Sequence, residues 1–148
     1  MGKKFKERRT AKEKILISLP PASTDNCIIV WSFDKVDRNG IFSFDLSRKD
    51  LDIENLFQKI LEFSTMKWCE LFPTDKRKSR HHTLSKESLS KQALERIEVL
   101  KLDEDTDSIF SLALNNKARL IGIRNGAVFQ VIWYDANHEF SISNKKHT

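Results

Sequence analysis

Three apolar, β-rich runs follow one another between residues 109 and 140, and their order predicts an antiparallel meander. The segment is IFSLALNNKARLIGIRNGAVFQVIWYDANHEF. Asn125-Gly126 lies between the second and third runs, and this pair between strand formers favours a type I′ hairpin turn because both central residues need positive φ. The pattern therefore predicts a three-strand meander at the C-terminal end of the fold.

The rest of the chain predicts one further strand and two helices. Residues 27–33 (CIIVWSF) have the composition of a strand. Apolar residues then recur at helical spacing, first from a capping box at Ser47 and Asp50 to about residue 63, and again from about residue 88 to residue 100. The order β-α-α-β-β-β indicates an α+β fold, with two helices packed on an antiparallel sheet, in a single domain over residues 23–148. Residues 1–22 are expected to form a basic, partly disordered arm.

The predicted turn decides which hairpin side chains share a face. With Asn125 and Gly126 as central residues, Gly122 is opposite Phe129. This face is apolar and should pack on the helices, and Gly122 leaves room for the Phe129 ring. The opposite face is half apolar and is a candidate docking surface for a protein partner, through Ile121, Ile123, Val128 and Ile132.

Four polar side chains gather on this second face, toward the open end of the hairpin. The register pairs Lys117 with Tyr134, with Arg119 beside them and His138 further along the last strand. Cations offset charge on a phosphorane-like transition state, and Tyr or His moves protons or stacks on a base. The four are therefore candidate catalytic residues for RNA phosphate chemistry. The alternative is that they are ordinary outward side chains whose stems lie over the sheet.

The formal net charge of +5 belongs to the N-terminal arm. Residues 1–14 hold seven Lys or Arg against two Glu, and the basic and acidic residues of the remaining chain cancel. The arm, with Lys3, Lys4, Arg8 and Arg9, is either a non-specific contact to nucleic-acid phosphates or a solvated extension.

A second basic stretch, residues 74–83, contains two adjacent histidines. It is interpreted either as an exposed loop or as part of a phosphate-binding patch formed by Arg77, Lys78, Arg80, His81 and His82. As a metal site the pair lacks further ligands, because Cys27 and Cys69 are isolated. With four glycines and no Gly-rich loop, the sequence predicts no cofactor.

Composition restricts the broad class. The chain has 148 residues, of which 39% are hydrophobic and 32% charged. No apolar run approaches the roughly 18–20 residues of a membrane span, and the basic N-terminus lacks the apolar core of a secretory signal. We therefore expect a cytoplasmic protein without a membrane partner, and the sequence does not indicate an oligomeric state.

The element order and two short motifs resemble the RelE/ParE superfamily of small bacterial toxins. Lys117-Ala118-Arg119-Leu120 matches its basic strand motif, and Asp135-Ala136-Asn137-His138 corresponds to the ending of its last strand. The motif similarity covers about 30 residues. The resemblance implies metal-independent mRNA cleavage on the ribosome by 2′-hydroxyl attack, with Lys117 and Arg119 neutralising phosphate and Tyr134 or His138 acting in proton transfer or stacking. It also implies an antitoxin partner. A non-enzymatic nucleic-acid-binding or protein-interaction module is the alternative.

Overall fold

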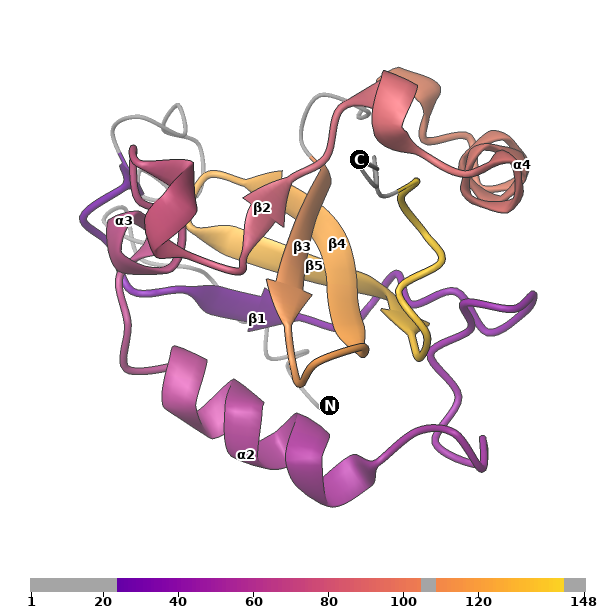
Figure 1. Ribbon diagram of the computed structural model, residues 1–148, viewed down its shortest axis with the longest axis horizontal. Coiled ribbons are helices and arrows are strands. Elements are labelled where there is room, and N and C mark those ends of the chain that lie inside the picture. The colour runs from indigo at the N-terminus through magenta and orange to yellow at the C-terminus, as the bar shows by residue number, and fades with distance from the viewer. Residues whose placement is uncertain (1–23, 105–108, 143–148) are drawn as a thin grey trace, which may run out of the picture.

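The computed structural model describes residues 24–104 and 109–142, and its centre is a five-stranded mixed sheet (Figure 1). The strand order is β1-β5-β4-β3-β2, in which β1 is parallel to β5 and the other neighbours are antiparallel. The strands are β1 (Val30–Ser32), β2 (His82–Thr83), β3 (Ile109–Ala113), β4 (Arg119–Asn125) and β5 (Val128–Asp135). The predicted α+β fold and C-terminal meander are confirmed. The predicted arm, residues 1–22, lies outside the described residues.

Helices cover both faces of the sheet. α2 (Ile53–Phe63) and α3 (Trp68–Leu71) lie on one face, and α4 (Lys91–Val99) lies on the other (Figure 1). Ile121, Ile123 and Ile132 are buried in the cluster that includes Ala93 and Ile97 of α4. The prediction that these isoleucines offer a docking surface is therefore wrong, because α4 already covers them. No helix in the described ranges is long and apolar enough to cross a membrane.

Side-chain caps set where the helices begin. The Asp52 carboxylate accepts the Asn55 N–H and starts α2, and the Ser90 hydroxyl accepts the Ala93 N–H and starts α4. The capping box expected at Ser47 is wrong, because the Ser47 N–H and hydroxyl both donate to Asp45 in a turn before the helix. The basic segment predicted as loop contains a short 3-10 helix, η2 (Lys76–Lys78), and β2. A second 3-10 helix, η3 (Lys86–Ser88), leads to α4.

A β-bulge at Ile132 changes the predicted register of the last hairpin. Gly122 pairs with Val131, but the next residue of β4, Ile121, pairs with Trp133, so Ile132 is the extra residue of β5. At the turn, Asn125 pairs with Val128, so the two central residues are Gly126 and Ala127 instead of Asn125 and Gly126. Beyond the bulge every side chain of β5 points to the opposite face from the one predicted.

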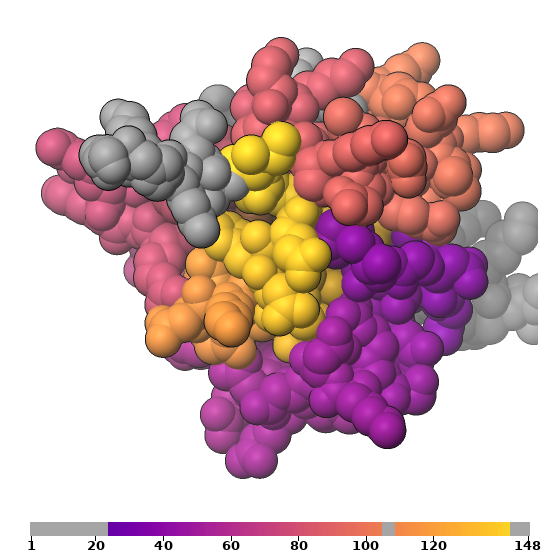
Figure 2. Space-filling view, turned by 45° about the vertical axis from the view of Figure 1, so that its right-hand side comes forward, coloured from indigo at the N-terminus to yellow at the C-terminus, as the bar shows by residue number. Residues whose placement is uncertain are grey.

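The segment after β1 fills the space beside the bulge. The Asp37 N–H donates to the Ile132 carbonyl at 2.8 Å, and the Tyr134 N–H donates to the Phe42 carbonyl at 2.9 Å. The buried Asp37 carboxylate also accepts from Arg96 of α4 and from the Trp133 indole, each at 2.9 Å. Figure 2 shows this early segment, in indigo, against the region of α4, with the C-terminal segment, in yellow, alongside both.

Gly122 cannot carry a larger side chain without moving backbone. A Cβ at this position would lie 2.0 Å from the Gln130 carbonyl oxygen and 2.7 Å from Cε1 of Phe129. We expect Gly122→Ala to lower the free energy of unfolding by about 3 kcal/mol, the upper range for overpacking. Denaturant unfolding checks this. Phe129→Ala should not rescue the variant, because the Gln130 carbonyl remains in place; a loss below about 1 kcal/mol would contradict the register.

Candidate phosphate-binding site

Arg119, the first residue of β4, is a buried arginine whose side chain is held, among the described residues, by main-chain carbonyls alone. The residue is 8% exposed, and its Nη1 donates to the carbonyls of Asn115 at 2.8 Å and Ala118 at 2.9 Å. No carboxylate of the described residues lies within 4 Å of it. No buried side-chain nitrogen in this part of the chain lacks a partner, so Nε and Nη2, which have none, are open to solvent.

Arg124, on the same strand, is a buried arginine whose charge is compensated within the fold. It is equally buried, at 8% exposed, but its Nη2 pairs with Asp25 at 2.8 Å and its guanidinium lies 4.0 Å from the Trp68 ring centroid. A buried charge normally needs such compensation. In the described ranges Arg119 has no carboxylate at ion-pair distance and no aromatic ring over its guanidinium, and the Asp135 carboxylate acts on it only at longer range, so its charge is available to an anion from outside.

The Arg119 charge acts on two histidines, His82 and His138. His82 pairs with Ser111 of β3, whose other neighbour is Ile121 on the strand that carries Arg119, and His138 follows the end of β5 by three residues. Burial lowers the pKa of His82, and the charge of Arg119 is the next largest cause. Burial and then the Arg119 charge likewise lower the pKa of His138. Both histidines are exposed at the surface. The charge of His138 also lowers the pKa of His82. One cation thus lies beside two groups that can move protons near neutral pH.

Asp135 positions His138. It pairs with Arg119 across the β4–β5 ladder, but its carboxylate accepts the N–H groups of Glu139 at 2.9 Å and Phe140 at 2.8 Å. These bonds close a turn in which His138 has a φ of 57°. Burial raises the pKa of Asp135. Sequence reasoning missed this residue, because without the bulge its side chain would point to the opposite face.

Arg80 joins the site through the turn between β3 and β4. Its Nη2 donates to the Asn115 carbonyl at 2.9 Å, the same oxygen that accepts from Arg119. The Asn115 side-chain oxygen accepts the N–H groups of Lys117 and Ala118 at 2.8 and 2.7 Å and so fixes the turn. Burial and the Arg80 charge lower the pKa of Arg119, which nevertheless stays protonated at neutral pH. The adjacent Asn115-Asn116 pair was the one sequence signal for this turn.

His81 immediately precedes β2 and packs on the α2 side of the sheet, against Phe63, whereas the exposed His82 is the first residue of the strand. Its Nδ1 accepts the Ala113 N–H at 2.9 Å, and its ring lies edge-on to Phe63 and Phe72. Burial, followed by the charge of His82, lowers the pKa of His81 to about 4. The two adjacent histidines therefore belong to different surroundings.

The four candidate catalytic residues separate into two pairs. Arg119 and His138 lie together, whereas Lys117 and Tyr134 line a separate shallow hollow with Asp50 and Asp52. Tyr134 is buried on the α2 side, where its hydroxyl donates to the Asp50 carbonyl at 3.4 Å. The expectation that Tyr134 shares a face with Arg119 is wrong, because the bulge at Ile132 reverses the end of β5.

The other predicted nucleic-acid contacts are distributed as follows. Arg77 is ion-paired with Asp75 at 3.1 Å, and Lys78 lines a pocket on the α2 side with His81. Lys3, Lys4, Arg8 and Arg9 lie outside the described residues. Within residues 24–104 and 109–142, no group of three or more His, Cys, Asp or Glu is placed to hold a metal ion.

Removing the Arg119 charge should raise the pKa of both neighbouring histidines. In Arg119→Gln the like charge disappears, so the protonated imidazolium of His82 and of His138 becomes easier to form. Histidine titration by NMR measures both values. The matched control is Arg38→Gln, an exposed arginine after β1 that should leave them unchanged. Unaltered histidine pKa values in Arg119→Gln would contradict the proximity of these three side chains.

Acid should destabilise the fold through His81. Its pKa is about 4 in the folded state against 6.5 as the ordinary value, so between these pH values the unfolded chain binds more protons. The free energy of unfolding therefore falls as pH drops from 6.5 to 4, by up to about 3 kcal/mol from this group. His81→Asn keeps an acceptor for Ala113 but does not titrate. Urea unfolding should show the stability difference between the wild type and this variant shrinking as pH falls; parallel curves would contradict the assignment.

Comparisons with family models, with curated proteins and with solved structures find no match to this chain. The function of the site has to be inferred from Arg119, the two histidines beside it and the turn that holds them.

Proposed function

We propose that this protein is a metal-independent endoribonuclease in which Arg119 binds the phosphate that is cleaved and His82 and His138 transfer the protons. The observation that carries the proposal is a buried arginine with no carboxylate partner in the described ranges, whose remaining donors open to solvent near two histidines. Guanidinium groups bind phosphate oxygens through paired N–H donors. Arg80, held on the same carbonyl, supplies a second cation.

The chemistry that suits this set is attack by the ribose 2′-oxygen. One histidine takes the proton of the 2′-hydroxyl as the 2′-oxygen bonds to phosphorus. The bond from phosphorus to the 5′-oxygen breaks, and the other histidine gives that oxygen a proton. The products are a 2′,3′-cyclic phosphate and a 5′-hydroxyl, and Arg119 offsets the charge on the phosphorus oxygens in the transition state. Of the sequence-predicted set, Arg119 and His138 keep their roles, and His82 takes the one assigned to Tyr134.

We further propose that the cleavage acts as a toxin on messenger RNA. Support for this comes from the sequence resemblance to the RelE/ParE superfamily at Lys117–Leu120 and Asp135–His138. The same resemblance favours an antitoxin as a protein partner. The wider class, RNA phosphate chemistry without a metal, is supported independently by the arrangement around Arg119.

The test is cleavage of a fluorescent single-stranded RNA in the presence of EDTA, with and without ribosomes. Arg119→Gln, His82→Asn and His138→Asn should each slow cleavage by about 100-fold or more, the usual contribution of a general acid or base. Arg38→Gln is the matched control and should cleave normally. DNA of the same sequence should remain intact because it lacks the 2′-hydroxyl. Wild-type cleavage by Arg119→Gln would overturn the proposed site.

The pH dependence gives a second readout. Because the pKa values of His82 and His138 are both lowered, the bell-shaped profile of kcat/KM should be displaced to the acid side of one built on two ordinary histidines. RNA binding without cleavage, weakening steeply with salt, would instead support the non-enzymatic nucleic-acid-binding alternative.

A further inference from the structure

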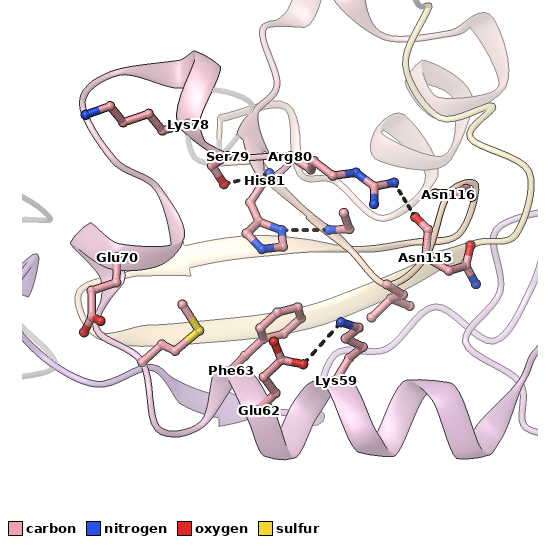
Figure 3. A pocket seen from close by; sticks show the side chains of 13 residues that line it. Lys59, Glu62, Phe63, Glu70, Lys78, Ser79, Arg80, His81, Asn115 and Asn116 are labelled. Atoms are coloured by element: carbon pink, nitrogen blue, oxygen red, sulfur yellow. Dashed lines mark hydrogen bonds and ion pairs between the residues drawn. The ribbon is translucent and has the colours of Figure 1, made fainter.

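A pocket of about 510 Å³ lies on the α2 side of the sheet and is lined by His81 but not by His82 or His138. Figure 3 shows it between α2 below and the segment that carries Ser79, Arg80 and His81 above, with Asn115 and Asn116 at one end. Its volume is in the range of sites that hold small organic groups. Of its lining, the phosphate chemistry described above uses Arg80 and the Asn115 carbonyl alone.

His81 presents one unused hydrogen-bond donor to this pocket. Since Nδ1 accepts the Ala113 N–H, the proton of the neutral ring is on Nε2. Nε2 has no protein partner among the described residues, and no buried side-chain nitrogen there is unsatisfied, so this atom opens into the pocket. The ring is fixed by its edge-on contact with Phe63, whose centroid is 5.0 Å away (Figure 3).

The remaining lining combines apolar side chains with polar and charged ones, among them the ion pair between Lys59 and Glu62 at 3.2 Å. Phe63, Met66 and Leu114 contribute the apolar part. Asn116 is exposed at the rim and makes no hydrogen bond within the described ranges, so its amide can both donate and accept. Flat rings with polar edges fit such a lining, and unpaired nucleobases are recognised in this way in single-stranded RNA.

The pocket and the phosphate site share a wall. Arg80 lines the pocket, and its guanidinium donates to the Asn115 carbonyl that also accepts from Arg119. The two sites are therefore separated by one peptide group of the β3–β4 turn. A phosphate bound at Arg119 and Arg80 would leave its nucleoside beside the opening of the pocket.

We infer that this pocket holds the base of a nucleotide adjacent to the cleaved phosphate, with the base edge bonded to Nε2–H of His81 and the amide of Asn116. The inference rests on the proposed ribonuclease function. It assigns His81 and Asn116 to substrate binding and not to proton transfer. Substitutions there should affect KM and leave kcat nearly unchanged.

The test uses RNA oligonucleotides in which one nucleotide at a time, on either side of the cleaved bond, lacks its base. In the wild type, one such position should raise KM about 10-fold, within the range measured for loss of a stacked base. Asn116→Ala and His81→Asn should raise KM for intact RNA and lose most of this discrimination. Asn116→Ala should melt at the wild-type temperature, since the exposed Asn116 side chain makes no hydrogen bond within residues 24–104 and 109–142. His82→Asn should lower kcat but keep the discrimination.

Binding of RNA with a 2′-deoxy nucleotide at the cleaved position, followed by fluorescence anisotropy, separates the two proposals. Normal cleavage with no position sensitive to base removal would overturn the pocket and leave the ribonuclease in place. Base-dependent binding that His81→Asn and Asn116→Ala abolish, without any cleavage of ordinary RNA, would overturn the ribonuclease and leave the pocket. Binding insensitive to both substitutions would overturn the pocket assignment.

Discussion

The extra residue at Ile132 is the constraint on which the rest of the structure depends. A bulge frees one carbonyl from the ladder, and a buried carbonyl must find another donor. The donor is the Asp37 amide, which draws the segment after β1 against the far half of β5. The Asp37 carboxylate then binds Arg96 and the Trp133 indole, so the same residue attaches α4 to the sheet. One inserted residue thereby organises the segment after β1, the last strand and a helix.

The bulge also decides what stands next to Arg119. Without it, Tyr134 would point to the Arg119 side and Asp135 to the α2 side. With it, Asp135 lies across the ladder from Arg119 but is occupied by two main-chain N–H groups, so no ion pair forms with the arginine. Carbonyl dipoles hold the guanidinium in place, and its charge is offset only at a distance, by Asp135. A buried charge without a close partner lowers the stability of the fold. Such a cost is common at binding sites and rare at positions whose role is structural.

Local patterns predicted the elements, and long-range contacts decided the site. The alternation of apolar and polar residues predicts the meander, and apolar residues at helical spacing predict the regions of α2 and α4. Both patterns work because they reflect which side chains are buried. The turn lies one residue later than the Asn-Gly pair predicts. That pair carries no information about the bulge at Ile132, because the Ile132 carbonyl accepts its hydrogen bond from Asp37, far away in the sequence. Arg119 and His138 were found because they share a hairpin. The sequence predicts His82 only as part of an exposed basic loop or of a phosphate-binding patch in that loop. Its position relative to Arg119 depends on the pairing of β2 with β3, and a strand of two residues has no recognisable sequence pattern.

The turn at Asn115 has a consequence for how this protein could vary. Surface turns between strands usually accept insertions, and tags or extra residues are commonly introduced there. Here a single carbonyl accepts from Arg80 and Arg119, and the neighbouring side-chain oxygen fixes the spacing to β4. Lengthening the turn by even one residue would pull apart the two guanidinium groups while leaving the apolar core intact. Among related chains, length at this turn would thus be a better marker of a retained site than similarity in the core.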